Sequence, residues 1–170
     1  MEMEQTVSDE VIEVPDLSAT DLVLLASQTV PFSYPTGDRL AGWNFYQDRK
    51  GNVDRGGKRY RVSILASERK IPTDAVRTYF RERGFTGNTA AFIALVMKRK
   101  PIGWWASIPE DDGVLCSVSF PFKEPILQVP CLNDGHHYPG LGLQRIVDSV
   151  CPSGYIWPAG WIFAAFREVK

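Results

Sequence analysis

Apolar residues in this chain occur in short runs that are separated by clusters of Gly, Pro, Asn and Asp. The longest runs, Ala90 to Met97 and Trp161 to Phe166, are far shorter than the roughly 20 residues that a membrane-spanning helix needs. Short runs between turn signals indicate several short strands and helices packed in layers. A transmembrane span is excluded, and 170 residues with 44% hydrophobic content suffice for one domain with its own core.

Charge is distributed unevenly along the chain although the formal net charge is only −1. Residues 1–38 contain eight acids and no Lys or Arg, whereas residues 39–100 contain fifteen Lys or Arg and five acids. The first part of the acidic region lacks apolar periodicity, so it is expected to lie outside the core. The sequence therefore predicts an extended acidic N-terminal arm over residues 1–17 and a single domain over residues 18–170.

A hairpin is predicted in the basic part of the chain. Glycines and Asn52 place its tip within residues 47–57, and residues 58–66 form the returning strand. Apolar and polar side chains alternate in this strand, which predicts one buried and one exposed face: Tyr60, Val62 and Ile64 against Arg59, Arg61 and Ser63.

The rest of the chain indicates a mixture of strands and helices. Capping and termination signals predict helices over residues 19–29 and 72–84, and a third helix is expected from Pro139-Gly140 to Val150. The patterns also predict four further strands, at residues 104–108, 114–120, 126–132 and 161–169. The expected fold class is α+β, with a mainly antiparallel sheet of about five to seven strands and two or three helices.

The segment Ala90 to Met97 is apolar on every side, so its periodicity is consistent with a buried strand or a buried helix. The turn residues that follow, 98–103, favour a strand in a hairpin.

Four side chains form a candidate reactive cluster: Cys131, His136, His137 and Cys151. Thiols and imidazoles are suitable zinc ligands, and a thiol beside an imidazole can act as a nucleophile. The spacing matches no common zinc motif, and free cysteines are often buried core residues. No motif indicates a cofactor, so the cluster is a secondary hypothesis and an enzyme is the less favoured class.

Basic residues form a second candidate site. The candidate contacts lie in the predicted hairpin and the helix after it, and they are Arg49, Lys50, Arg55, Lys58, Arg59, Arg61, Arg77 and Arg81. Arg83 adds to the same helix, and the aromatic residue Tyr60 lies among the bases of the hairpin. Such residues can neutralise phosphates and stack on bases. The alternative is a solvated strand edge that Lys and Arg protect from aggregation.

Tryptophans provide a third pattern. Trp104, Trp105, Trp157 and Trp161 could line a ligand groove, although such residues more often fill cores and interfaces. Trp104 and Trp105 are adjacent in a predicted strand, so their rings point to opposite faces of the sheet.

The charge pattern favours a structural or interaction protein, a subunit of an oligomeric assembly such as a phage or virus particle. In this hypothesis the acidic arm contacts the basic segment 49–83 of a neighbouring copy or a different protein. Deletion of residues 1–17 is then expected to leave a folded monomer. The alternatives are a nucleic-acid-binding module and a small Cys/His metal or thiol enzyme. Three cysteines without a signal sequence predict thiols in the cytoplasm, or in a virion if the assembly is viral.

Overall fold

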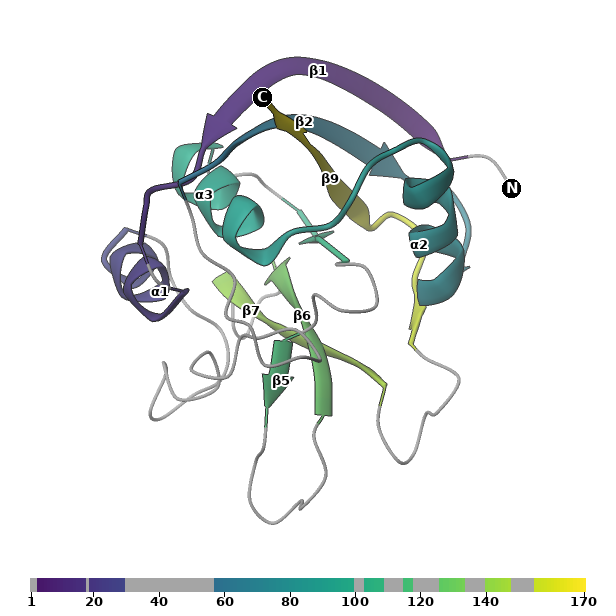
Figure 1. Ribbon diagram of the computed structural model, residues 1–170. Coiled ribbons are helices and arrows are strands. Elements are labelled where there is room, and N and C mark those ends of the chain that lie inside the picture. The colour runs from purple at the N-terminus through teal and green to yellow at the C-terminus, as the bar shows by residue number, and fades with distance from the viewer. Residues whose placement is uncertain are drawn as a thin grey trace.

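The computed structural model describes residues 3–17, 19–29, 57–99, 103–108, 115–117, 126–133, 140–147 and 155–170. Three helices lie in these ranges: α1 (Ala19–Ser27), α2 (Thr73–Glu82) and α3 (Thr89–Arg99). The strands in these ranges are β1 (Glu4–Glu13), β2 (Arg59–Ala66), β3 (Ile71–Pro72), β4 (Trp105–Ala106), β5 (Leu115–Ser117), β6 (Ile126–Asn133), β7 (Gly140–Val147), β8 (Ile156–Trp157) and β9 (Ile162–Val169). The predicted α+β class is confirmed (Figure 1).

Seven strands form one mainly antiparallel sheet with the order β1-β2-β9-β4-β6, to which β5 and β7 add through β6. Strand β7 pairs along β6, while β4 and β5 pair with different ends of it. The β4–β9 pair is parallel, and the other pairs of the sheet are antiparallel. Strands β3 and β8 form a separate pair.

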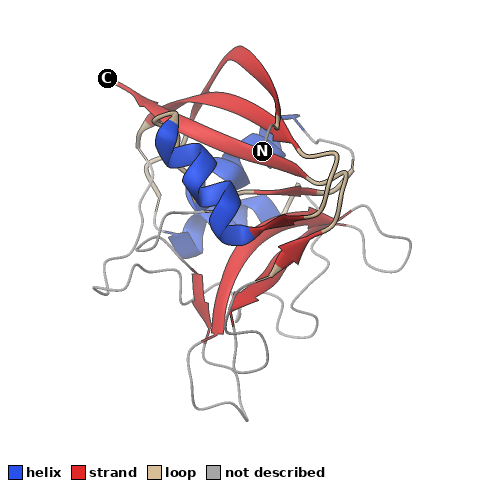
Figure 2. Ribbon diagram, turned by 90° about the vertical axis from the view of Figure 1, so that its right-hand side faces the viewer, coloured by secondary structure: helices blue, strands red, loops and turns tan. Residues whose placement is uncertain are grey.

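Both faces of the β2–β9 part of the sheet are covered by helices. On one face Ala164 and Phe166 pack with residues of α1 and α3. On the other face Phe163 and Ala165 pack with residues of α2. Successive residues of a strand point to opposite faces, so β9 contributes to two cores at once. Figure 2 shows α2 in front of the upper strands, with the other helices behind them.

Helix α2 begins and ends as the sequence predicts. Thr73 follows Pro72 at its start, and Gly84, with φ of +70°, follows its C-terminal turn. Glycine adopts this left-handed conformation without steric penalty, which is why it commonly ends a helix. Phe85 donates a backbone hydrogen bond to the carbonyl of Phe80 at 2.9 Å and returns the chain to the core.

The segment at residues 90–97 is a helix, so the favoured interpretation as a strand in a hairpin is wrong. The side-chain oxygen of Asn88 accepts a hydrogen bond from the Ala91 amide at 2.8 Å, which is the contact of a helix N-cap. Residues 90–96 are all buried, and a helix that is apolar on every side is stable only in such an environment.

The helix predicted to begin at Pro139-Gly140 is also wrong, because residues 140–147 form strand β7. Gly140 and Gly142 disfavour a helix, and pairing with β6 satisfies the backbone of this segment instead. The predicted basic hairpin is also wrong, because its returning strand, β2, pairs with β1 and β9 and not with the segment before it. Its predicted tip, residues 47–56, lies outside the described residues.

The N-terminal segment does not lie outside the core, so the expected arm is wrong over residues 3–14. Strand β1 pairs with β2 of the same chain, from Glu4 opposite Ala66 to Glu13 opposite Arg59. Ile12 and Val14 are each 1% exposed within the same core as α3. Backbone hydrogen bonds to β2 hold this segment in place, although the segment contains few apolar residues. Acidic side chains are typical of an edge strand because they discourage pairing with other chains.

Replacement of Ile12 by Ala tests whether β1 is part of the folded core. We expect Ile12→Ala to lower the free energy of unfolding by about 3 kcal/mol, because it leaves a cavity beneath the sheet. The partly buried neighbour Val11 provides the control, and Val11→Ala should have a smaller effect. Urea denaturation measures both variants. Equal stability of Ile12→Ala and the unaltered protein would show that β1 is dispensable.

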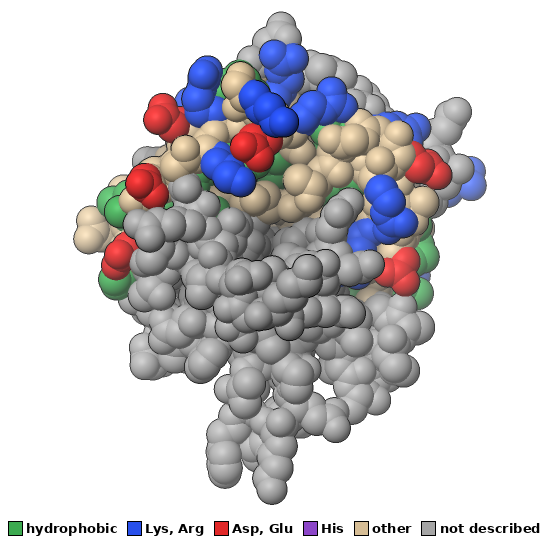
Figure 3. Space-filling model, in the orientation of Figure 1, with side chains coloured by type: hydrophobic (Ala, Val, Ile, Leu, Met, Phe, Trp, Pro, Cys, Tyr) green, Lys and Arg blue, Asp and Glu red, His purple; other side chains and the backbone are tan. Residues whose placement is uncertain are grey.

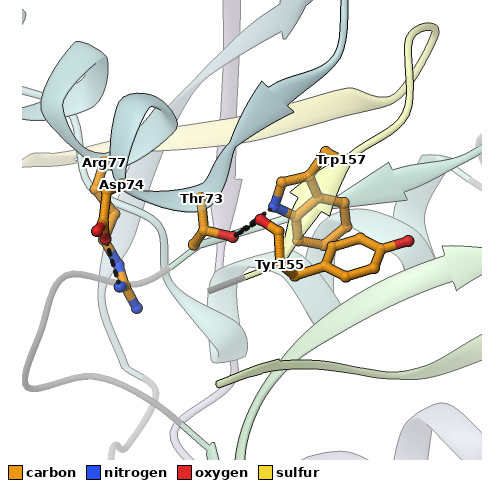
Figure 4. Close-up of polar contacts among 5 residues, drawn as sticks. All are labelled: Thr73, Asp74, Arg77, Tyr155 and Trp157. Carbon is orange, nitrogen blue, oxygen red and sulfur yellow. Dashed lines mark hydrogen bonds and ion pairs between the residues drawn. The ribbon is translucent and has the colours of Figure 1, made fainter. Parts of the chain in front are cut away.

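A buried hydroxyl connects α2 to the segment before β9 (Figure 4). The Thr73 hydroxyl donates to the carbonyl oxygen of Tyr155 at 2.7 Å and accepts from the indole Nε1–H of Trp157 at 3.0 Å. Trp157 is fully buried and packs against the rings of Trp161 and Phe163. The indole N–H has no access to water there, so the Thr73 hydroxyl satisfies a donor that would otherwise be unpaired.

Removal of this hydroxyl should therefore destabilise the protein. We expect Thr73→Val, which conserves the shape of the side chain, to lower the free energy of unfolding by about 2 kcal/mol because the indole N–H loses its acceptor. Thr73→Ser retains the hydroxyl and should lose less. The comparison is made by urea denaturation, and a Thr73→Val variant as stable as Thr73→Ser would contradict this role.

Candidate functional site

The α2 face of the sheet changes from apolar to basic beyond the end of the helix. In β2 the residues of this face run from the buried Leu65 and Ser63 to the exposed Arg61 and Arg59. In β9 the buried residues Phe163 and Ala165 are followed on the same face by the exposed Arg167. The last residues of β9 extend past α2 in Figure 2. On this face, the end of the sheet that α2 covers has buried core residues, whereas the end beyond α2 has charged residues.

Arg61 and Arg167 are directly opposite each other in the antiparallel β2–β9 pair. Side chains at such positions are close neighbours, and two like charges there destabilise the pair. Within the described part of the chain, neither guanidinium has a carboxylate within 4 Å, and the same holds for the exposed Arg59. Arg61 and Arg167 therefore lack a described carboxylate partner, whereas Arg59 has Glu13 directly opposite it in the β1–β2 pair, without an ion pair within 4 Å.

Arg167 is held in place by the turn that follows α2. Its Nη2 donates to the carbonyl oxygen of Arg83 at 2.6 Å, and its Nε donates to that of Gly84 at 3.4 Å. The guanidinium carbon lies 4.6 Å from the centre of the Phe85 ring. These contacts satisfy carbonyls at the C-terminal end of α2, where a cation is favoured by the helix dipole.

Arg83 is placed beside Arg167 by the same turn. Its guanidinium carbon lies 3.5 Å from the centre of the Tyr79 ring, and its Nη1 is 3.8 Å from the carboxylate of Glu82. Both partners of this ion pair are exposed, so water weakens their attraction. We define the basic surface as Arg59, Arg61, Arg83 and Arg167. Figure 3 shows Lys and Arg side chains gathered in the upper part of the molecule, with a few acids between them.

The predicted basic contacts do not all belong to this surface. Arg59 and Arg61 do, and the exposed Arg81 flanks it in the last turn of α2. Lys58 lies 3.5 Å from the carboxylate of Glu168. Arg77 is 8% exposed and 3.5 Å from Asp74, so it is a structural residue rather than a surface contact (Figure 4). Arg49, Lys50 and Arg55 lie outside the described residues.

Arg167 is the member of the surface that the sequence did not indicate. It lies more than one hundred positions after Arg61 in the chain, and only the β2–β9 pairing brings the two together. The alternation of β9 places Arg167 on one face, but the neighbouring strand follows from the sheet order, which local patterns do not specify.

The acidic N-terminal strand is neutralised elsewhere in the same chain. The Glu10 carboxylate lies 3.7 Å from Arg99 and 4.0 Å from Lys98, at the C-terminal end of α3. The Lys98 ammonium also donates to the carbonyl oxygen of Val11 at 3.3 Å. Glu10 therefore has a basic counterpart within its own fold that is not the basic surface, whereas Glu13 is directly opposite Arg59 of that surface in the β1–β2 pair.

Cys131 is a core residue. Its side chain packs in the α2-side core, and burial raises the pKa of its thiol to about 12. The thiol is protonated at neutral pH, whereas nucleophilic attack and zinc binding both use the thiolate. His136, His137 and Cys151 lie outside the described residues. Among the residues that are described, no cluster of three His, Cys, Asp or Glu side chains could hold a metal ion.

The raised pKa makes a direct prediction for Cys131. We expect iodoacetamide at pH 8 to leave Cys131 unmodified in the native protein, because the thiol is both protonated and buried. Unfolding in urea should expose it and allow alkylation. Peptide mass spectrometry separates Cys131 from the other cysteines. Alkylation in the native state at the rate seen in urea would restore the thiol-enzyme hypothesis.

The tryptophans divide between the core and the surface. Trp157 and Trp161 are 0% and 7% exposed, so they fill the core rather than a groove. Trp104 is 42% exposed and lies 5.3 Å from the Trp161 ring, whereas Trp105 is buried. Trp105 belongs to β4, whereas Trp104 precedes this strand.

Comparison with known proteins gives no functional assignment. The chain matches no protein-family model, no curated protein and no solved structure. Among the described helices, none combines the length and the apolar character that a membrane crossing demands.

Proposed function

We propose that this protein binds nucleic acid through the basic surface. The observation that supports this function is that Arg61 is directly opposite Arg167, and that neither guanidinium has a described carboxylate within 4 Å. Keeping like charges adjacent destabilises a sheet, and an anionic ligand removes that repulsion. The guanidinium group matches a phosphate with two parallel hydrogen bonds, which makes arginine a suitable residue for such a ligand.

A nucleic acid fits the surface better than the acidic segment of this chain. The sequence suggested that residues 1–17 contact the basic segment of a neighbouring copy. In the structure Glu10 pairs with Lys98 and Arg99 of its own chain, and Ile12 is buried beneath the sheet. Assembly into a larger particle stays a prediction, but the free acidic arm that favoured it is absent from the described fold. We also propose that the protein acts in the cytoplasm.

Removal of charge from the basic surface tests the function. We expect Arg59→Gln/Arg61→Gln to weaken binding of a labelled DNA duplex about tenfold or more at low salt, since two charged contacts are lost. The slope of log K against log salt should become shallower by about 1.8, or 0.9 for each phosphate contact. Fluorescence anisotropy between about 50 and 200 mM salt measures both quantities.

The matched control is Arg69→Gln/Lys70→Gln, which removes the same charge from two exposed residues beyond the other end of β2. The backbone of Arg69 forms hydrogen bonds with the Ser67 hydroxyl through both its carbonyl oxygen and its N–H, and the substitution leaves these bonds intact. An equal loss of affinity in this control would show that only net charge matters. No binding by the unaltered protein, or equally effective competition by polyglutamate, would reject nucleic acid as the ligand.

A further inference from the structure

The aromatic rings next to the basic surface are covered rather than available. Tyr79 and Phe85 are each 8% exposed. The guanidinium of Arg83 lies 3.5 Å from the centre of the Tyr79 ring, and that of Arg167 lies 4.6 Å from the centre of the Phe85 ring. Proteins that bind single strands offer aromatic faces on which bases stack. Here the two rings support arginines and leave little surface to a base.

The exposed tryptophan lies too far away to compensate. The carbonyl oxygen of Trp104 accepts a hydrogen bond from the Ile162 amide at 2.8 Å, which places Trp104 beside the start of β9. Arg167 is near the other end of that strand, about 17 Å away at the usual rise of a strand. Tyr60, the aromatic residue between Arg59 and Arg61, is 6% exposed and packs on the opposite face. The described surroundings of the basic surface thus provide charge without a stacking platform.

The geometry of Arg167 also favours contact with a backbone over the reading of bases. Its Nε and Nη2 donate to the two carbonyls of the turn after α2. A guanidinium fixed in this way presents its remaining N–H groups at the surface and does not extend into a groove. Contacts to phosphates position a protein on nucleic acid, whereas contacts to base edges specify the sequence.

We infer that the basic surface binds the phosphate backbone of double-stranded nucleic acid without reading its sequence. This inference rests on the proposed function and names the class of nucleic acid. A duplex carries a charge about every 1.7 Å along its axis, twice the density of one of its strands. A surface that gains affinity from charge alone prefers the denser polyanion, whereas a stacking surface prefers unpaired bases.

Four labelled DNA probes of equal length test the inference: two duplexes that differ in base composition, and one strand from each. We expect both duplexes to bind with affinities within about threefold of each other, well below the tenfold or more that a lost base contact causes. Each duplex should bind more tightly than its single strand. Tighter binding of a single strand, or a preference above tenfold for one duplex, overturns the inference while leaving nucleic-acid binding intact. No binding of any probe rejects the proposed function itself.

Two substitutions separate phosphate contact from stacking. Phe85→Leu removes the aromatic face beside Arg167 and retains an apolar side chain in the core, so duplex affinity should fall less than it does when the charge of Arg167 is removed. Arg167→Gln removes the charge and should weaken duplex binding about tenfold, as expected for a lost charged contact. Thermal unfolding confirms that both variants are folded before they are compared. A larger loss with Phe85→Leu than with Arg167→Gln would show that the ring contacts the ligand, which overturns the inference.

Discussion

The antiparallel pairing of β2 with β9 is the interaction on which the rest of the structure depends. It runs without interruption from Arg59 opposite Val169 to Ala66 opposite Ile162. Because side chains alternate along each strand, this one ribbon supplies the floor of two cores, one beneath α3 and one beneath α2. The same ribbon connects the edge strand β1 to the strands on the other side of the molecule.

The length of α2 decides where the sheet is covered and where it is open. Gly84 ends the helix, Phe85 returns to the core, and Thr86 pairs with Phe166 by two backbone hydrogen bonds. The chain thereby passes the edge of β9 and enters α3 on the opposite face. The end of the sheet beyond this crossing carries arginines in place of apolar residues, since solvent and not a helix lies above it. The basic surface therefore results from the position at which α2 ends and the chain crosses to the other face of the sheet.

Local patterns predicted several parts of this arrangement correctly. Alternation in residues 59–62 placed the arginines and Tyr60 on opposite faces, and Pro72 and Gly84 marked the limits of α2. Local patterns gave the wrong secondary structure where the same pattern is compatible with both a helix and a strand. The apolar segment at residues 90–97 is a helix because Asn88 caps it and two layers bury it. Residues 140–147 are a strand because β6 offers them a partner. The Asn88 cap is local, but the burial of residues 90–96 and the pairing of β7 with β6 are contacts with other segments, and these decided between structures of similar local preference.

The sequence by itself determined the fold class, the exposure of Arg59 and Arg61 and the concentration of positive charge near them, because these depend on spacings of two to four residues and on composition. The predicted exposed face of β2 is wrong at Ser63, which is buried because both faces of the sheet are covered there. Only the tertiary structure decided that the acidic segment joins its own sheet, that Cys131 is buried, and that Arg167 lies opposite Arg61. The physical reason is that strand order and register join residues far apart in the chain. Every residue except proline has the same backbone donor and acceptor, so strand pairing leaves little trace in the local sequence.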